Sequence, residues 1–117
     1  MSGLNEFREN REHMNKRILD QKSLVTNRFF SLDTKTYEPG ALDSKTKELA
    51  GLAASMVLRC DDCIAYHTIR CKELGCTNAE IWEVYEVSLI VGGSIVIPHM
   101  RRAVSLLDEL DAQTARE

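Results

Sequence analysis

The sequence predicts an all-α protein, a compact bundle of five to six helices. Apolar residues recur at helical spacing, capping and stop residues divide the chain into segments, and no segment of useful length alternates as a strand would. With 117 residues, of which 44% are hydrophobic and 28% charged, the chain has the size and composition of a folded globular domain. We therefore expect a single domain that spans residues 1–117.

The first forty residues predict two helices. The first ends near Gln21 and carries one narrow apolar stripe, which is typical of a surface helix. The residues of this stripe are Leu4, Phe7, Met14 and Ile18. A second helix is expected over residues 24–32, because residues 33–40 after it are rich in turn formers.

The middle of the chain predicts two helices with a break between them. The first begins at Asp43 or Ser44, whose side-chain oxygens can cap free backbone N–H groups, and it ends near Cys60. Carboxylates are stabilising at a helix N-terminus, so the pair Asp61-Asp62 favours a restart at that point. The second helix then continues to Gly75, a residue type that favours helix ends.

The C-terminal third predicts two further helices. Thr77 and Glu80 have the spacing of a capping box, and the helix that they open is expected to end near Gly92-Gly93. A last helix is expected over residues 94–111, with its first residue as the cap. Pro98 fits near its start, because the backbone N–H that proline lacks would have no partner within the helix there.

Charge and hydropathy exclude two classes of partner. The net charge is -3 and the basic residues are mixed with acidic ones, so the chain has no concentrated positive surface for nucleic acid. The N-terminus lacks the apolar core of a signal peptide, and no segment has the apolar length needed to cross a bilayer. We expect no nucleic-acid partner, no membrane association and a cytoplasmic location.

Four cysteines lie close together in the middle of the chain, whereas a secreted scaffold would spread them to join distant loops. They are Cys60, Cys63, Cys71 and Cys76. On one helix, His67 and the first three of these cysteines would project from a single stripe roughly 80° wide. Four side chains that project the same way cannot surround a zinc ion tetrahedrally. A zinc site would need another ligand: Cys76, His99, His13 or a group of another subunit.

A haem attachment motif is also excluded, because Ile64 stands where that motif needs a histidine. We expect no metal and no cofactor.

A Cys-x-x-Cys pair at a helix start can close a small disulfide, and the positive end of the helix favours the reactive thiolate. His67 stands four residues after Cys63, close enough to accept its proton directly or through water. The alternative is that these are small buried cysteines and a structural histidine. Their joint spacing favours redox chemistry.

The spacing of four residues resembles that of a known family. Glu48 is followed after eleven residues by Cys60, after two more by Cys63, and after three more by His67. This pattern resembles the AhpD-like family of alkyl hydroperoxide reductase proteins, within the wider carboxymuconolactone decarboxylase superfamily. The resemblance covers about residues 43–110. Residues 1–40 show no family-specific feature, and we expect this helical extension to serve oligomer contacts.

The resemblance implies an activity as well as a fold. Relatives are all-helical homo-oligomers, often trimers or hexamers, that reduce hydroperoxides with electrons from a dithiol or protein donor. Cys60 and Cys63 would cycle between dithiol and disulfide, with Cys63 attacking the peroxide. Glu48 would act as the relay carboxylate through His67. On an unbroken helix Glu48 would point roughly 100° away from the cysteines, so this role requires a break between the two helices.

One residue departs from the pattern. Some family members carry a histidine immediately before the second cysteine, where this chain has Asp62. A carboxylate beside the thiols opposes their ionisation, so peroxidase activity would be weakened. Two other functions stay open: a non-redox reaction of the carboxymuconolactone decarboxylase type, and a non-catalytic oligomeric binding module.

We assign no chemistry to the remaining candidates. Cys71 and Cys76 are interpreted as structural, in line with the usual burial of free cysteine. His99 near the start of the last helix lines a cleft or is exposed. Arg101 and Arg102 could bind an anionic substrate, but a solvated helix face is the favoured interpretation.

Overall fold

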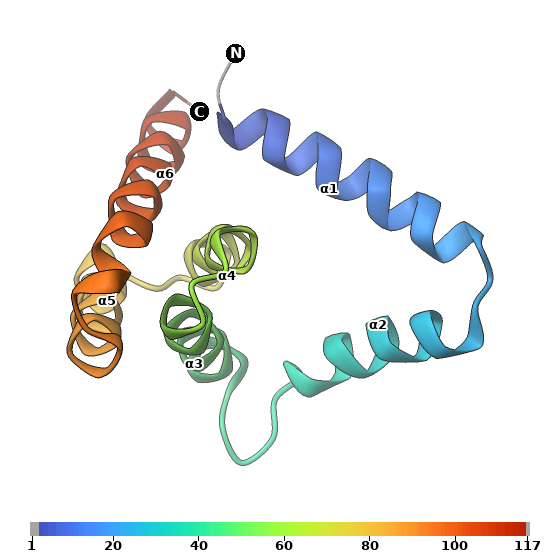
Figure 1. The fold of residues 1–117 in the computed structure, drawn as a ribbon. Helices are drawn as coiled ribbons and strands as arrows, with labels where there is room; N and C mark the ends of the chain where they lie inside the picture. Colours follow the sequence, from blue (N-terminus) through green and yellow to red (C-terminus); the bar gives the residue numbers. More distant parts are fainter. Residues whose placement is uncertain (1–2, 117) are drawn as a thin grey trace. The chain divides into compact units, whose positions relative to one another are not determined.

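The computed structural model describes residues 3–116, which form six α-helices, one short 3₁₀ helix and no β-strand (Figure 1). The α-helices are α1 (Gly3–Asp20), α2 (Leu24–Thr36), α3 (Ser44–Val57), α4 (Asp61–Glu73), α5 (Asn78–Gly92) and α6 (Ile97–Arg116), and the 3₁₀ helix η1 (Ser94–Val96) joins the last two. The predicted all-α class is confirmed. Within residues 3–116, no helix is long and apolar enough to cross a membrane. The chain divides into two compact units, one ending at Glu38 and one beginning at Pro39.

The first unit is the helix pair α1 and α2, which contact each other. Ser23 caps α2 by accepting a hydrogen bond from the Thr26 N–H at 3.5 Å. The helix extends to Thr36, beyond the end expected from the turn formers. Hydroxyl groups near its end donate back to carbonyls one turn earlier, from Thr34 to Phe30 and from Thr36 to Leu32. These bonds occupy polar side chains without ending the helix.

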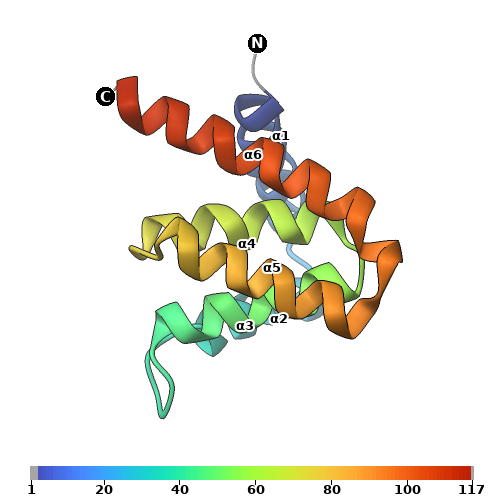
Figure 2. The ribbon, with the colours of Figure 1, turned by 90° about the vertical axis from the view of Figure 1, so that its left-hand side faces the viewer.

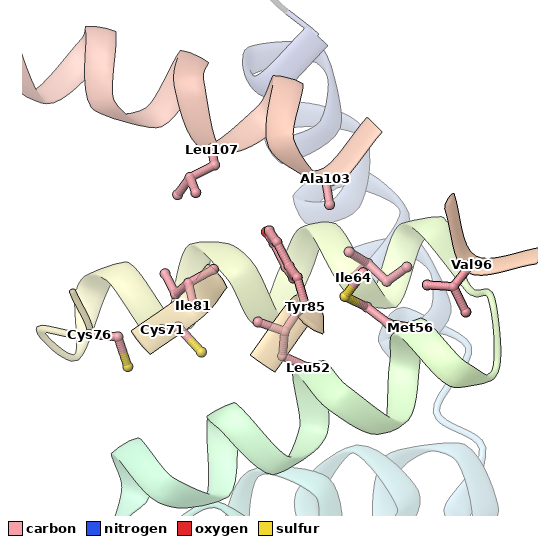
Figure 3. Close-up of a cluster of buried hydrophobic side chains, with 10 residues drawn as sticks. All are labelled: Leu52, Met56, Ile64, Cys71, Cys76, Ile81, Tyr85, Val96, Ala103 and Leu107. Carbon is pink, nitrogen blue, oxygen red and sulfur yellow. The ribbon is translucent and has the colours of Figure 1, made fainter. Parts of the chain in front are cut away.

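The second unit is a four-helix arrangement around one apolar core. α3 packs against α4 and α5, and α6 lies across α4 (Figure 2). The buried cluster takes residues from all four helices, from η1 and from the connection between α4 and α5 (Figure 3): Leu52, Met56, Ile64, Cys71, Cys76, Ile81, Tyr85, Val96, Ala103 and Leu107. Burial of this apolar surface is the main force that holds α4 between α3 and α6.

A buried polar contact ties α4 to α5. The Tyr85 hydroxyl lies 3.2 Å from the Thr68 hydroxyl, and both side chains are fully buried. Burial raises the pKa of Tyr85 to about 12, so the phenol stays neutral over the physiological range. The ring of the more exposed Trp82 meets the Tyr85 ring edge-on, with centroids 6.1 Å apart.

Local sequence signals set most helix ends in this unit. Thr77 and Glu80 form the predicted capping box at the start of α5. Gly75, which follows the C-cap residue Leu74 of α4, and Gly93, which directly follows α5, take φ values of 86° and 84°, which glycine adopts readily. The last helix differs from the prediction. Backbone bonds of the i to i+3 type first form η1, and α6 begins only at Ile97.

Candidate active site

The candidate site forms where α3 ends and α4 begins. α3 stops at Val57, earlier than the expected end near Cys60. The Arg59 N–H donates to the Met56 carbonyl and the Cys60 N–H to the Ser55 carbonyl, at 3.0 and 3.1 Å. This bond pair is a Schellman motif, and it places Arg59 at a φ of 60°. The left-handed residue turns the chain so that α4 packs back against α3.

Cys60 and Cys63 lie at the N-terminus of α4 and are joined as a disulfide, with Cα atoms 5.3 Å apart. Cys60 is the N-cap residue of the helix, and its sulfur accepts a hydrogen bond from the Cys63 N–H at 3.3 Å. Both residues are half-buried. The Cys63 N–H and the dipole of α4 therefore favour negative charge on the Cys60 sulfur.

Glu48 and His67 meet between α3 and α4. The Glu48 Oε2 atom lies 2.7 Å from the His67 Nδ1 atom. The Glu48 side chain is only 1% exposed and that of His67 11%. A carboxylate can only accept, so this contact places the ring proton on Nδ1 when Glu48 is ionised and the imidazole is neutral. The turn at Arg59 makes the contact possible, as the requirement for a break between the two helices anticipated.

Two further residues surround this pair. The Arg70 Nε atom lies 3.8 Å from the Glu48 Oε1 atom, so a cation faces the second carboxylate oxygen. Arg70 also binds Glu73, and that hydrogen bond raises the pKa of the guanidinium. The Tyr66 ring lies edge-on to the His67 imidazole at a centroid distance of 5.2 Å. The sequence interpretation did not single out Arg70 or Tyr66 as neighbours of this pair.

A second polar cluster links the start of α4 to α6. The Asp61 Oδ1 atom lies 2.7 Å from His99 Nδ1, and its Oδ2 atom accepts a hydrogen bond from Arg102 Nε at 2.9 Å. Sequence reasoning placed both α6 residues on a solvated or cleft-lining face and missed this contact, because they lie 38 and 41 residues from Asp61. The available signal was their i, i+3 spacing, which puts both on one face of α6.

The other two cysteines lie away from this turn and are buried and free. Burial raises the pKa of the Cys71 thiol and of the Cys76 thiol, which disfavours the reactive form of each. Their burial agrees with the structural interpretation. Within residues 3–116, no group of three or more His, Cys, Asp or Glu residues could hold a metal ion. His13 lies exposed on α1.

The arrangement has three chemically useful parts. The cysteine pair can hold two electrons, as dithiol or disulfide. The helix N-terminus stabilises negative charge on sulfur, and the buried Glu48–His67 pair can take up or release a proton one helical turn after Cys63.

Comparison with known proteins agrees with this fold. The model of the carboxymuconolactone decarboxylase family matches residues 24–106, a range that includes α2. A Paracoccus denitrificans protein known as uncharacterized protein 4 in cox locus is 31% identical over 87 residues, which are 74% of this chain and 78% of that protein.

Solved structures of similar proteins come from two organisms. A Thermotoga maritima crystal structure is 53% identical, has a TM-score of 0.93, and is matched over 96% of this chain and 98% of that one. A second Thermotoga maritima structure, at 52% identity and a TM-score of 0.90 over 95% and 94% of the chains, is described as a family protein that is a candidate for the antioxidative response. A family protein from Legionella pneumophila, at 24% identity and a TM-score of 0.83 over 91% and 95% of the chains, shares the fold.

The family model covers well over half of the 117 residues, and solved structures of family proteins share the fold along nearly the whole chain. The chain therefore belongs to the carboxymuconolactone decarboxylase family.

Proposed function

We propose that this protein is a thiol-dependent antioxidant oxidoreductase that reduces hydroperoxides, with alkylhydroperoxidase or peroxiredoxin-like activity. The observation that carries the proposal is the disulfide-forming pair Cys60 and Cys63, held one helical turn from a buried Glu48–His67 contact of 2.7 Å. The description of the Thermotoga maritima relative as a candidate for the antioxidative response supports the same class of chemistry.

The first step oxidises Cys63. His67 takes the thiol proton through Nε2, because Nδ1 is engaged by Glu48. The Cys63 thiolate attacks one peroxide oxygen, the O–O bond breaks, and the sulfur becomes a sulfenic acid. The departing alkoxide takes the proton back from the imidazolium and leaves as an alcohol. Glu48 stabilises the transient imidazolium and fixes the ring orientation.

The second step closes the disulfide. Cys60 is stabilised as a thiolate by the helix N-terminus, so its sulfur attacks the sulfenic sulfur of Cys63. The S–S bond forms and the hydroxyl group leaves as water after it gains a proton. A dithiol or protein donor then supplies two electrons and two protons. In that reduction Cys60 is the better leaving group, so the donor attacks the Cys63 sulfur.

Asp62 and the N-terminus of α4 affect the rate of the first step in opposite directions. Asp62 is the second residue of α4 and lies beside Cys63 in the chain. Its carboxylate opposes formation of a thiolate and slows the first step. The helix N-terminus acts in the opposite sense, because it favours negative charge in the same turn.

The proposal includes assembly into a homo-oligomer, a trimer or hexamer. The C-terminal end of α5 and the helix η1 expose apolar side chains: Val87 at 58%, Ile90 at 85%, Val91 at 70% and Ile95 at 54%. α2 exposes a second set: Leu24, Val25, Phe29 and Leu32. Several large apolar side chains at this exposure on one segment are typical of surfaces that another chain covers. We propose one domain over the whole chain and a cytoplasmic location, where Cys71 and Cys76 stay reduced.

A second candidate function is a non-redox reaction of the decarboxylase type, which the family match over residues 24–106 favours. It would use Glu48 and His67 as acid and base without the cysteines. Turnover of a lactone by a protein with both Cys60→Ser and Cys63→Ser separates the two functions. Retained lactone turnover together with no peroxide consumption by the wild type would replace our proposal with this one.

The order of attack has its own test. Hydroperoxide is added to the reduced Cys60→Ser and Cys63→Ser proteins, and sulfenic acid is trapped with a dimedone probe and located by mass spectrometry. We expect a trapped sulfenic acid on Cys63 in the Cys60→Ser protein and little on Cys60 in the Cys63→Ser protein. The reverse pattern would make Cys60 the attacking residue.

A further inference from the structure

We propose that Arg102 of α6, together with His99, is a positioning residue for the cysteine pair and acts through Asp61. The inference rests on the proposed redox function and adds to it a control of the thiols by a helix that contributes no cysteine. Both oxygens of the Asp61 carboxylate are engaged by α6, at 2.7 Å by His99 Nδ1 and at 2.9 Å by Arg102 Nε.

The place of Asp61 in the chain gives this contact its effect. Asp61 is the first residue of α4 and stands directly after Cys60. The contacts with α6 fix the Asp61 carboxylate and thereby hold the first turn of α4. This turn contains both sulfur atoms and the N–H group that binds Cys60. The geometry of the redox pair is therefore coupled to α6.

The charge of the Arg102 guanidinium also favours a thiolate in this turn. Asp61 and Asp62 place two carboxylates in the turn that must carry a thiolate, and like charges disfavour it. Arg102 brings a full positive charge against one of them. The Arg102 and Asp61 side chains are 59% and 44% exposed, so solvent screens the effect and it is modest.

Arg102 is not needed to hold α6 on α4. Ala103 and Leu107 of α6 are buried in the core, and at the far end of α4 the Lys72 Nζ atom lies 3.0 Å from Asp111 Oδ1. Loss of the Arg102 side chain therefore leaves the packing in place. The contact of Asp61 with His99 and Arg102 is local to the cysteine turn, so its loss is expected to change the thiols without unfolding the helix packing.

The test compares Arg102→Gln with Arg101→Gln, which removes the same charge from the neighbouring, exposed position of α6. Two quantities are measured in the whole protein: the alkylation rate of the reduced cysteines by iodoacetamide at neutral pH, and the disulfide equilibrium with glutathione. For Arg102→Gln we expect alkylation about threefold slower and the equilibrium shifted about threefold toward the disulfide, the size of effect typical of a partly exposed ion pair. Arg101→Gln stays at the wild-type values.

Two more variants show whether Asp61 transmits the effect. Adding Asp61→Asn to Arg102→Gln removes the carboxylate that has lost its guanidinium partner and returns both quantities toward the wild type. Arg102→Lys keeps the charge without the guanidinium geometry and gives an intermediate value. Equal shifts in Arg102→Gln and Arg101→Gln, or no recovery in the double variant, overturn the inference and leave the proposed function intact. A wild-type protein that forms no disulfide with glutathione overturns both.

Discussion

Glu48→Gln tests the buried proton relay most selectively, and we predict a loss of about a hundredfold in the rate of hydroperoxide reduction. Glu48 is 1% exposed and its Oε2 atom lies 2.7 Å from His67 Nδ1. Glutamine has nearly the same shape, and its amide oxygen can accept the same hydrogen bond. The substitution therefore removes the charge without opening a cavity.

The expected magnitude follows from the charge that forms during the reaction. Once His67 takes a proton, its charge centre lies about 4 Å from that of the carboxylate, and such a pair interacts by about 4 kcal/mol at an effective dielectric constant of about 20. The cost of keeping both groups out of water offsets part of this. Arg70, whose Nε atom lies 3.8 Å from Glu48 Oε1, weakens it further. After these reductions we expect about 2.7 kcal/mol of the attraction between the imidazolium and the carboxylate to remain, which corresponds to about a hundredfold in rate.

The assay is stopped-flow consumption of an organic hydroperoxide by fully reduced protein. The matched control is Glu73→Gln, because Glu73 binds Arg70 at 2.9 Å but its side chain is 52% exposed. We expect the control to keep the rate within about twofold. A Glu48→Gln protein with the wild-type rate and an unchanged unfolding transition would refute the reasoning. If this variant unfolds, His67→Gln is expected to show the same loss.

Three other predictions concern stability and thiol access. Arg59→Gly is expected to raise the urea midpoint, with a gain of up to about 1 kcal/mol in the free energy of unfolding. The left-handed backbone costs a residue other than glycine about 1–2 kcal/mol, and the greater freedom of glycine in the unfolded chain offsets part of this. A lower midpoint would contradict the prediction. Burial raises the pKa values of Cys71 and Cys76, so in oxidised native protein neither is expected to react rapidly with Ellman's reagent, and both react after unfolding; a rapid reaction in the native state would contradict the structure. Hydrogen bonds with Thr77 lower the pKa of Glu80 from 4.5, so its stabilising contribution is present above that pH and is lost as the pH falls through the depressed value. Glu80→Gln should flatten this part of the pH–stability curve, and an unchanged slope would exclude Glu80 as its source.

Most helices could be predicted from local signals, but the ends of α2 and α3 and the start of α6 could not. The capping box at Thr77 and the glycine at position 75 mark their boundaries through backbone chemistry that a short window contains. α3 instead ends through Arg59 at a φ of 60°, where the sequence offers no glycine as a signal. α2 continues to Thr36 because hydroxyl groups bind carbonyls within the helix, although the same residues are common in turns.

The candidate site shows the same division. Cys60, Cys63 and His67 are spaced three and four residues apart, which places them near one another on successive helical turns, and this could be predicted from the sequence. The approach of Glu48 to His67 required a break between α3 and α4, which the sequence interpretation stated as a condition and the structure contains. The contact of Asp61 with α6 depends on how distant helices pack, and no pattern within one segment encodes it.

The central claim, that Cys60 and Cys63 form a redox pair that reduces hydroperoxide, is tested most directly by a single-turnover titration of the reduced protein. The measurement combines hydroperoxide consumption with a mass-spectrometric thiol count of each chain. The proposal predicts that each chain consumes one equivalent of hydroperoxide and forms a Cys60–Cys63 disulfide, with Cys71 and Cys76 still reduced. Reduced protein that consumes no hydroperoxide and keeps all four of its thiols would contradict it.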